Sequence, residues 1–163
     1  MMELKKISAS AVPKALDLAE RYRLLNEPEQ AASICRDVLE VDPSNQTAAR
    51  MLLLAITDQF GRHRSVGLRA AQEALPAIED PYVRAYMEGV AYERWARAKL
   101  SEKMHGAMVY EFVQQALAAY ERAEAIRPEG NDDAILRWNT CARLVNHLPD
   151  LKPAEAAGEV HFD

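Results

Sequence analysis

Histidine and cysteine side chains are the first candidates for metal binding or nucleophilic catalysis, and this chain contains few of either. The histidines are His63, His105, His147 and His161, which lie far apart in the sequence. None belongs to a His-Glu-x-x-His helix, in which two imidazoles share one face and hold a metal. The two cysteines, Cys35 and Cys141, form no Cys-x-x-Cys pair, and each lies in an apolar pattern where a thiol acts as a small hydrophobic group. We therefore expect no metal site and no cysteine nucleophile.

The carboxylates and glycines give no stronger sign of catalysis. Glu20, Glu27 and Glu29 are close in sequence, but they fall at a predicted turn between helices, where carboxylates are normally solvated. The chain has no Gly-rich phosphate loop and no Gly-x-Ser-x-Gly nucleophile elbow. These patterns predict a protein that is not an enzyme and uses no cofactor. An enzyme whose site the sequence conceals is the alternative.

Composition and charge narrow the class of protein further. The 163 residues are 49% hydrophobic and 28% charged, which is typical of one globular domain. The net charge of −5 argues against nucleic acid, and we expect the densest basic stretch, Arg62 to Arg64, to be a loop. No signal peptide follows Met1, and the longest apolar run, Met51 to Ile56, is too short to span a bilayer. A cytoplasmic protein without a membrane partner is expected.

Apolar residues recur at helical spacing almost throughout and predict seven helices without a sheet. The predicted helices cover residues 10–25, 28–41, 46–60, 65–78, 81–104, 107–126 and 132–147. Ser65 is the expected N-cap of the fourth helix, and Pro76 should end or kink it. His147 should complement the C-terminus of the seventh helix.

One pattern occurs twice and predicts how the helices pack. Ala31, Cys35, Val38 and Pro43 are separated by the same steps of 4, 3 and 5 as Ala116, Tyr120, Ala123 and Pro128. Small residues let two antiparallel helices approach closely, the bulky residue fills the remaining space, and the proline ends the helix. The sequence therefore indicates a repeated helix-turn-helix unit.

This pattern resembles the tetratricopeptide repeat, a helix-turn-helix unit of about 34 residues. In the first unit, residues 12–45, Leu18, Ala19 and Tyr22 stand where the family has Leu, Gly or Ala, and Tyr. The second unit, 48–81, is degenerate, with Asp58 at the tyrosine position and Glu79 at the proline position. The third covers about 82–130, followed by a closing helix at 132–147 and a tail at 149–163. The resemblance implies an all-α, right-handed superhelical stack of antiparallel helix pairs within residues 1–148.

The third unit is longer than the family pattern. The step from Gly89 to Ala116 is 27 residues, against an expected step of about 12. Because both flanks remain periodic, we expect each helix to be extended by about two turns, roughly 10 Å. A loop insertion is the alternative.

The resemblance also implies a concave groove, formed by the first helix of each unit, that binds a peptide. The matching positions are Leu16, Glu20, Arg23, Leu52, Ile56, Gln59, Tyr86, Val90 and Glu93, and the closing helix adds Asn139. Leu16 and Glu20 stand where some members carry a lysine and asparagine grip for a C-terminal carboxylate. The groove is therefore expected to be mainly apolar, centred on Tyr86, and to suit an apolar or amphipathic segment. The competing interpretation is that Leu52, Ile56 and Val90 pack against neighbouring helices.

A second surface is expected at the tip of the elongated third unit. Its apolar side chains would be poorly covered by other units and would favour an interface. They are Trp95, Met104, Met108 and Tyr110. Val160 and Phe162 of the tail could also dock in the groove of the same or a second molecule. The leading hypothesis is an adaptor that binds a protein or peptide, and the alternative is a structural subunit that forms a homo-oligomer.

Overall fold

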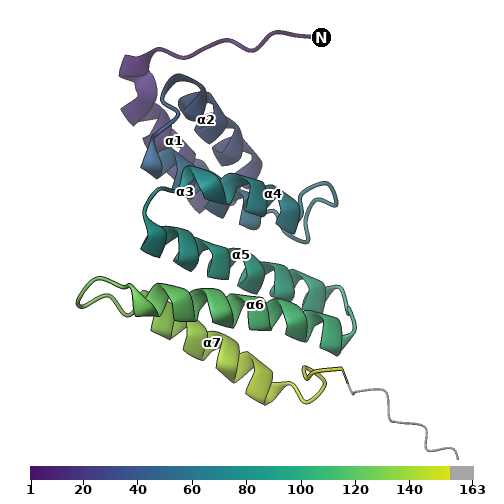
Figure 1. The fold of residues 1–163 in the computed structure, drawn as a ribbon. Helices are drawn as coiled ribbons and strands as arrows, with labels where there is room; N and C mark the ends of the chain where they lie inside the picture. The colour runs from purple at the N-terminus through teal and green to yellow at the C-terminus, as the bar shows by residue number, and fades with distance from the viewer. Residues whose placement is uncertain (155–163) are drawn as a thin grey trace, which may run out of the picture.

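A computed structural model of the chain describes residues 1–154, in which every regular element is helical (Figure 1). The seven α-helices of this range are α1 (Val12–Leu24), α2 (Pro28–Val41), α3 (Gln46–Thr57), α4 (Leu68–Ala74), α5 (Pro81–Ser101), α6 (Gly106–Ala125) and α7 (Asp133–His147). Two 3-10 turns, Ala9–Ala11 and Leu75–Ala77, flank α1 and α4. The predicted all-α class and the number of α-helices are confirmed.

Side chains cap the N-termini of several helices. Asn45 caps α3 by accepting a hydrogen bond from the Ala48 amide at 2.8 Å, and Asp80 caps α5 from the Val83 amide at 3.1 Å. The prediction for α4 was wrong at its start, because the helix begins at Leu68 and not at Ser65. Residues 58–67 form turns and irregular segments instead, so α3 and α4 are joined by a longer loop than expected.

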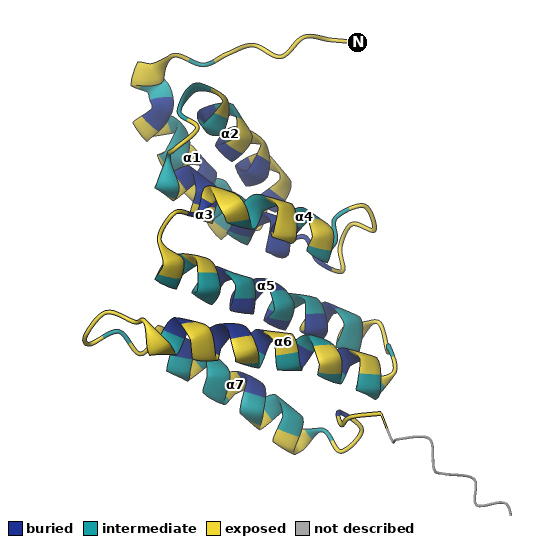
Figure 2. Cartoon of the chain, in the orientation of Figure 1, coloured by how far each residue is buried: buried dark blue, intermediate teal, exposed yellow. Residues whose placement is uncertain are grey.

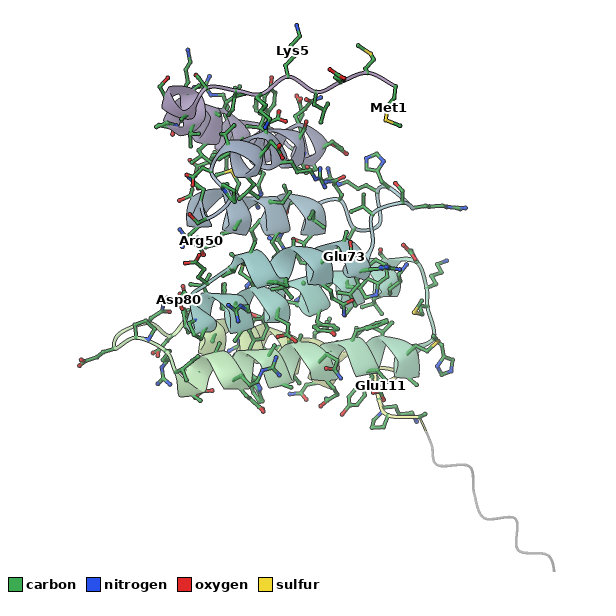
Figure 3. All side chains as sticks on the ribbon, turned by 45° about the horizontal axis from the view of Figure 1, so that its top comes forward. Met1, Lys5, Arg50, Glu73, Asp80 and Glu111 are labelled. Atoms are coloured by element: carbon green, nitrogen blue, oxygen red, sulfur yellow. The ribbon has the colours of Figure 1, made fainter. Side chains whose placement is uncertain are left out.

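The helices stack in chain order from α1 to α7 (Figure 1). Each packs against the next, and α3 also contacts both α1 and α5. Residues 1–8 form no helix, and Met1 and Lys5 lie in a segment beyond the first helices (Figure 3). Buried residues gather on the facing sides of the helices, while exposed ones point outward (Figure 2). The odd-numbered helices α1, α3 and α5 are thus successive neighbours in the stack.

The repeated small-bulky-small positions all lie in the core. Ala31, Cys35, Val38, Ala116, Tyr120 and Ala123 are each 0% exposed. Gly89 of α5 faces Tyr120 of α6 so closely that a Cβ atom added at Gly89 would overlap the tyrosine ring. For Tyr120 the predicted role of a bulky residue that fills the space between two helices is confirmed, because the missing side chain at Gly89 gives Tyr120 its space.

The third helix pair is elongated by helix and not by a loop. α5 has 21 residues and α6 has 20, whereas α3 has 12, and a short turn at residues 102–105 joins α5 to α6. The expectation of two lengthened helices is confirmed, and the loop alternative is wrong. No helix within residues 1–154 has the length and hydropathy needed to cross a membrane.

Candidate functional site

A carboxylate at the end of α3 joins three helices. Asp58 accepts hydrogen bonds from Arg23 of α1 and Arg94 of α5, each at 2.6 Å. Arg94 also donates to the hydroxyl of Thr57 at 2.8 Å. Burial lowers the pKa of Arg94, and the Asp58 charge opposes that shift. These charge-assisted bonds fix the C-terminal parts of α1 and α3 against the middle of α5.

A second carboxylate, Glu93 of α5, is 3% exposed and has three partners. It accepts from the Tyr120 hydroxyl at 2.7 Å, from Arg97 at 3.2 Å and from Arg137 of α7 at 3.3 Å. Burial and the Glu93 charge raise the pKa of Tyr120, so its hydroxyl stays protonated and donates. A buried charge is tolerated only with such partners.

We call the set Arg23, Asp58, Arg94, Glu93 and Arg137 the arginine ladder, because it links α1, α3, α5 and α7. The side chains of Arg23, Arg94 and Arg137 are 25%, 26% and 32% exposed, respectively. Each is therefore packed against the protein over most of its surface and reaches solvent with the rest. With three arginines and two carboxylates, the ladder carries a net positive charge. It makes the side formed by the odd-numbered helices a charged and firmly connected face, which we call the odd-helix face.

The predicted groove residues divide into two groups. Ile56, Gln59, Val90 and Glu93 are buried. This corrects their expected place on an open surface, because side chains in contact with neighbouring helices have no surface left for a ligand. Leu16, Arg23, Leu52, Tyr86 and Asn139 are partly buried, and Glu20 is exposed. Leu16 and Leu52 each pack on core clusters through part of their surface. The odd-helix face is therefore less apolar than expected.

Tyr86 lies at the centre of the contacts among α5, α6 and α7. Its ring stacks with Tyr82 at 6.2 Å and packs against Tyr120 at 5.9 Å, and Arg137 donates to its hydroxyl at 3.5 Å. Asn139 lies about 200° around α7 from Arg137, since each residue turns a helix by about 100°. Arg137, and not the predicted Asn139, thus provides the contribution of α7 to this face.

Sequence reasoning missed Asp58, Arg94 and Arg137 as members of the site. One signal was present, because Asp58 is a departure from the family pattern where an aromatic residue is expected. A carboxylate at a position that faces neighbouring helices needs basic partners. The sequence alone does not reveal that these partners lie on α1 and α5.

The tip of α5 and α6 is better covered than expected. Trp95 packs edge-on against Phe60 at 5.2 Å and Phe112 at 6.3 Å, and Leu151 after α7 is 3% exposed. The expectation of a poorly covered tip is therefore wrong for the side of Trp95 that contacts these rings, and Trp95 as a whole is partly buried. Met104 and Tyr110 are partly buried, and Met108 is 56% exposed. Val160 and Phe162 lie outside the described residues.

Both cysteine side chains are buried in the core, and His147 lies in the last turn of α7. Burial raises the pKa of Cys35 to about 11 and that of Cys141 to about 12, so both are thiols at neutral pH. His147 Nδ1 lies 2.7 Å from the Arg143 carbonyl oxygen in the last turn of α7, as expected. Within residues 1–154, no group of three or more His, Cys, Asp or Glu side chains is arranged to hold a metal.

Comparisons of the chain with protein-family models, with curated proteins and with solved structures found no match. The resemblance to tetratricopeptide repeats consequently rests on the chain's own residues.

Proposed function

We propose that this chain is a protein-interaction module of tetratricopeptide type, whose odd-helix face binds an amphipathic polypeptide segment. In this proposal the helix pairs form a short right-handed superhelix, and α7 closes its last apolar side. A stack of helix pairs of this kind presents an extended surface to a partner.

The observation that carries the proposal is the arginine ladder, which joins four helices across one face. Asp58 holds α1 and α5 together, and Glu93 holds α7 on α5. A face held in place before binding loses little conformational entropy when a ligand binds. A preformed surface of this kind supports a binding role.

The residues on this face indicate the chemistry of the segment. Leu16, Leu52 and Tyr86 offer partly exposed apolar surface. Each guanidinium has five N–H donors, and the partly exposed arginines of the ladder retain donors for a polar ligand group. An amphipathic segment would place apolar side chains on the first set and hydrogen-bond acceptors on the second.

The coverage of the tip favours this role over self-association. Among the four predicted tip residues only Met108 is exposed, and single exposed apolar residues are common on protein surfaces. Self-association through the tip remains the alternative hypothesis.

Selection from a displayed library of random peptides, with the purified full chain as bait, tests the proposal. An enriched peptide should bind Tyr86→Ala at least tenfold more weakly than the original chain, because a central aromatic residue carries much of the binding energy of an interface. Tyr110→Ala is the matched control, since Tyr110 is also partly buried but lies on α6. Equal binding by the original chain and Tyr86→Ala would contradict the proposal.

A second pair of variants avoids any loss of core packing. Glu20 is exposed on α1, and Glu111 is exposed on α6 with its side chain pointing away from the stack (Figure 3). Glu20→Arg should change the affinity of the enriched peptide, whereas Glu111→Arg should leave it unchanged.

A further inference from the structure

The unequal lengths of α3 and α5 create a step at one edge of the stack. α3 ends at Thr57, whereas α5 continues past Arg94, the partner of Asp58, for about two more turns. The loop 58–67 lies over these turns. Phe60 packs on Trp95, and a Cβ atom at Gly61 would lie 3.5 Å from that of Ala98.

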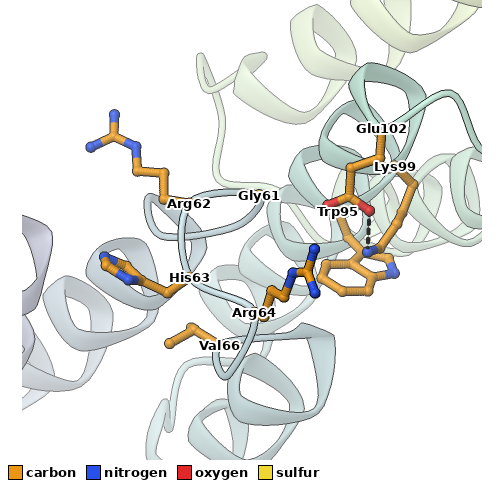
Figure 4. Close-up of a pocket in the computed structure, with 8 residues that line it drawn as sticks. All are labelled: Gly61, Arg62, His63, Arg64, Val66, Trp95, Lys99 and Glu102. Carbon is orange, nitrogen blue, oxygen red and sulfur yellow. Dashed lines mark hydrogen bonds and ion pairs between the residues drawn. The ribbon is translucent and has the colours of Figure 1, made fainter.

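A cavity of about 600 Å³ lies between this loop and the end of α5 (Figure 4). We call it the step pocket. Basic and aromatic side chains dominate its lining, with one carboxylate: Arg62, His63, Arg64, Trp95, Lys99 and Glu102. A volume of this size fits a few amino-acid side chains.

The charges of the step pocket are only partly neutralised. Lys99 pairs with Glu102 at 2.7 Å, and His63 pairs with Glu29 of α2. Arg62 and Arg64 are exposed, and among residues 1–154 neither lies within ion-pair distance of a carboxylate, although the Arg62 charge contributes to lowering the pKa of Glu29. The pocket is therefore locally positive in a chain whose net charge is −5.

Trp95 supplies a fixed apolar surface beside these charges. The Lys99 ammonium lies 4.2 Å from the ring centroid, and Phe60 holds the ring edge-on. Figure 4 shows Arg64 pointing toward Trp95 and Lys99, whereas Arg62 points away from them. The pocket thus combines an aromatic ring with two nearby cations and a third at its rim.

We propose that the step pocket binds an acidic polypeptide segment, which pairs its carboxylates with Arg64, Lys99 and Arg62 and places an apolar side chain against Trp95. Guanidinium groups bind carboxylates with two parallel hydrogen bonds, which favours Arg64 as the main contact. The step pocket differs from the odd-helix face, so this proposal stands independently of the function proposed above.

The charge pattern favours a polypeptide over a nucleic acid. A nucleic-acid strand needs a continuous basic path for successive phosphates. Here Glu29 and Glu102 lie beside the basic residues and limit the positive surface to a compact patch. A short cluster of carboxylates matches such a patch better than a phosphate backbone.

Tryptophan fluorescence offers a local probe, because Trp138 is the only other tryptophan of the chain. In the full chain with Trp138→Phe, emission reports on Trp95 alone. The probes are a short synthetic peptide rich in glutamate and leucine, the same peptide with glutamine in place of glutamate, inorganic phosphate and a single-stranded oligonucleotide. We expect the glutamate peptide to change the emission with an affinity that falls as salt is added.

Charge reversal locates the binding. Arg62→Glu with Arg64→Glu should weaken binding of the glutamate peptide at least tenfold, because attraction becomes repulsion. The matched control is Arg36→Glu with Arg143→Glu, which makes the same charge change at two exposed sites on α2 and α7. This control should bind within about twofold of the parent, since screening weakens distant charges.

Four outcomes would overturn the proposal. They are no response to the glutamate peptide, equal binding of the glutamine peptide, equal loss in the two charge-reversed proteins, and tighter binding of phosphate or the oligonucleotide. None of these outcomes depends on Tyr86 or on a library-selected peptide, so they leave the test of the odd-helix face untouched.

Discussion

The arginine ladder and the step pocket use the same type of side chain in two different ways. In the ladder, Arg23 and Arg94 share Asp58, and their side chains are only about a quarter exposed. In the step pocket, Arg62 and Arg64 are exposed and unpaired within residues 1–154. The first pair of arginines holds helices together. The second pair adds positive charge to the surface, and the fold does not depend on it.

This difference in pairing and exposure predicts which arginines contribute to stability and which contribute to binding. When one residue of a half-buried ion pair is replaced, the other residue keeps its charge but loses its partner. That charge is then partly desolvated without compensation. An exposed, unpaired arginine leaves no such group behind. Substitutions in the ladder should therefore lower stability, and substitutions of Arg62 and Arg64 should alter binding alone.

The largest effect is expected at Glu93. Glu93→Ala leaves Arg137 and the Tyr120 hydroxyl without their buried acceptor, and should lower the free energy of unfolding by about 3–5 kcal/mol. Urea unfolding followed by circular dichroism measures this change. Glu73→Ala is the control, because Glu73 is 65% exposed and should change stability by less than about 0.5 kcal/mol. Similar losses in both variants would show that the ladder is not a special source of stability.

A smaller loss is expected at Asp58. Asp58→Ala removes the shared partner of Arg23 and Arg94, and should cost about 1–3 kcal/mol, less than at Glu93 because all three side chains reach solvent. The same unfolding measurement applies, with the exposed Asp17→Ala on α1 as its control. An unchanged midpoint of urea unfolding for Asp58→Ala would contradict the claim that ladder residues stabilise the fold and the pocket arginines do not.

The pH dependence of stability tests whether the two cysteine thiols are shielded from water in the core. The pKa values of Cys35 and Cys141 are raised to about 11 and about 12, above the ordinary value of 9.0. Their contribution to stability is therefore complete below pH 9, and is lost as pH rises through the folded values. At pH 10 we expect a loss of about 1 kcal/mol for each thiol. A protein with Cys35→Ala and Cys141→Ala should lack this part of the pH dependence, and identical curves would contradict the buried-thiol assignment.

The smallest stability effect is expected in the step pocket. Arg62→Ala with Arg64→Ala should change the free energy of unfolding by less than about 0.5 kcal/mol, because neither side chain has an ion-pair partner to lose. Thermal unfolding checks this prediction. A loss as large as that of Asp58→Ala would mean that the loop 58–67 depends on these arginines for its structure.

Periodicity was enough to predict the helices, because the pattern of apolar residues directly reflects the buried side of a helix. The repeated pattern also predicted that Tyr120 fills the space left by small residues between packed helices, but the contact of Tyr120 with Gly89 emerged only from the structure. Periodicity did not predict the loop 58–67, since Ser65 was a plausible cap and nothing local showed that α4 begins at Leu68.

The candidate site was harder to predict, because its contacts join residues far apart in the chain. Ile56 and Val90 have the same spacing whether they line a groove or a core, and only the packing of α3 on α5 decides between the two. Arg62 and Arg64 were correctly expected in a loop, but the pocket they line depends on the different lengths of two helices. Such a step is visible only once the helices are packed.

The most direct test of the binding role is a map of amide chemical-shift changes in the full chain on addition of a library-selected peptide. We predict that the changes gather at Leu16, Glu20, Leu52 and Tyr86 on the odd-numbered helices, and spare the exposed sides of α2 and α6. Changes confined to α2, α6 or the tip around Met108 would contradict the proposed binding face.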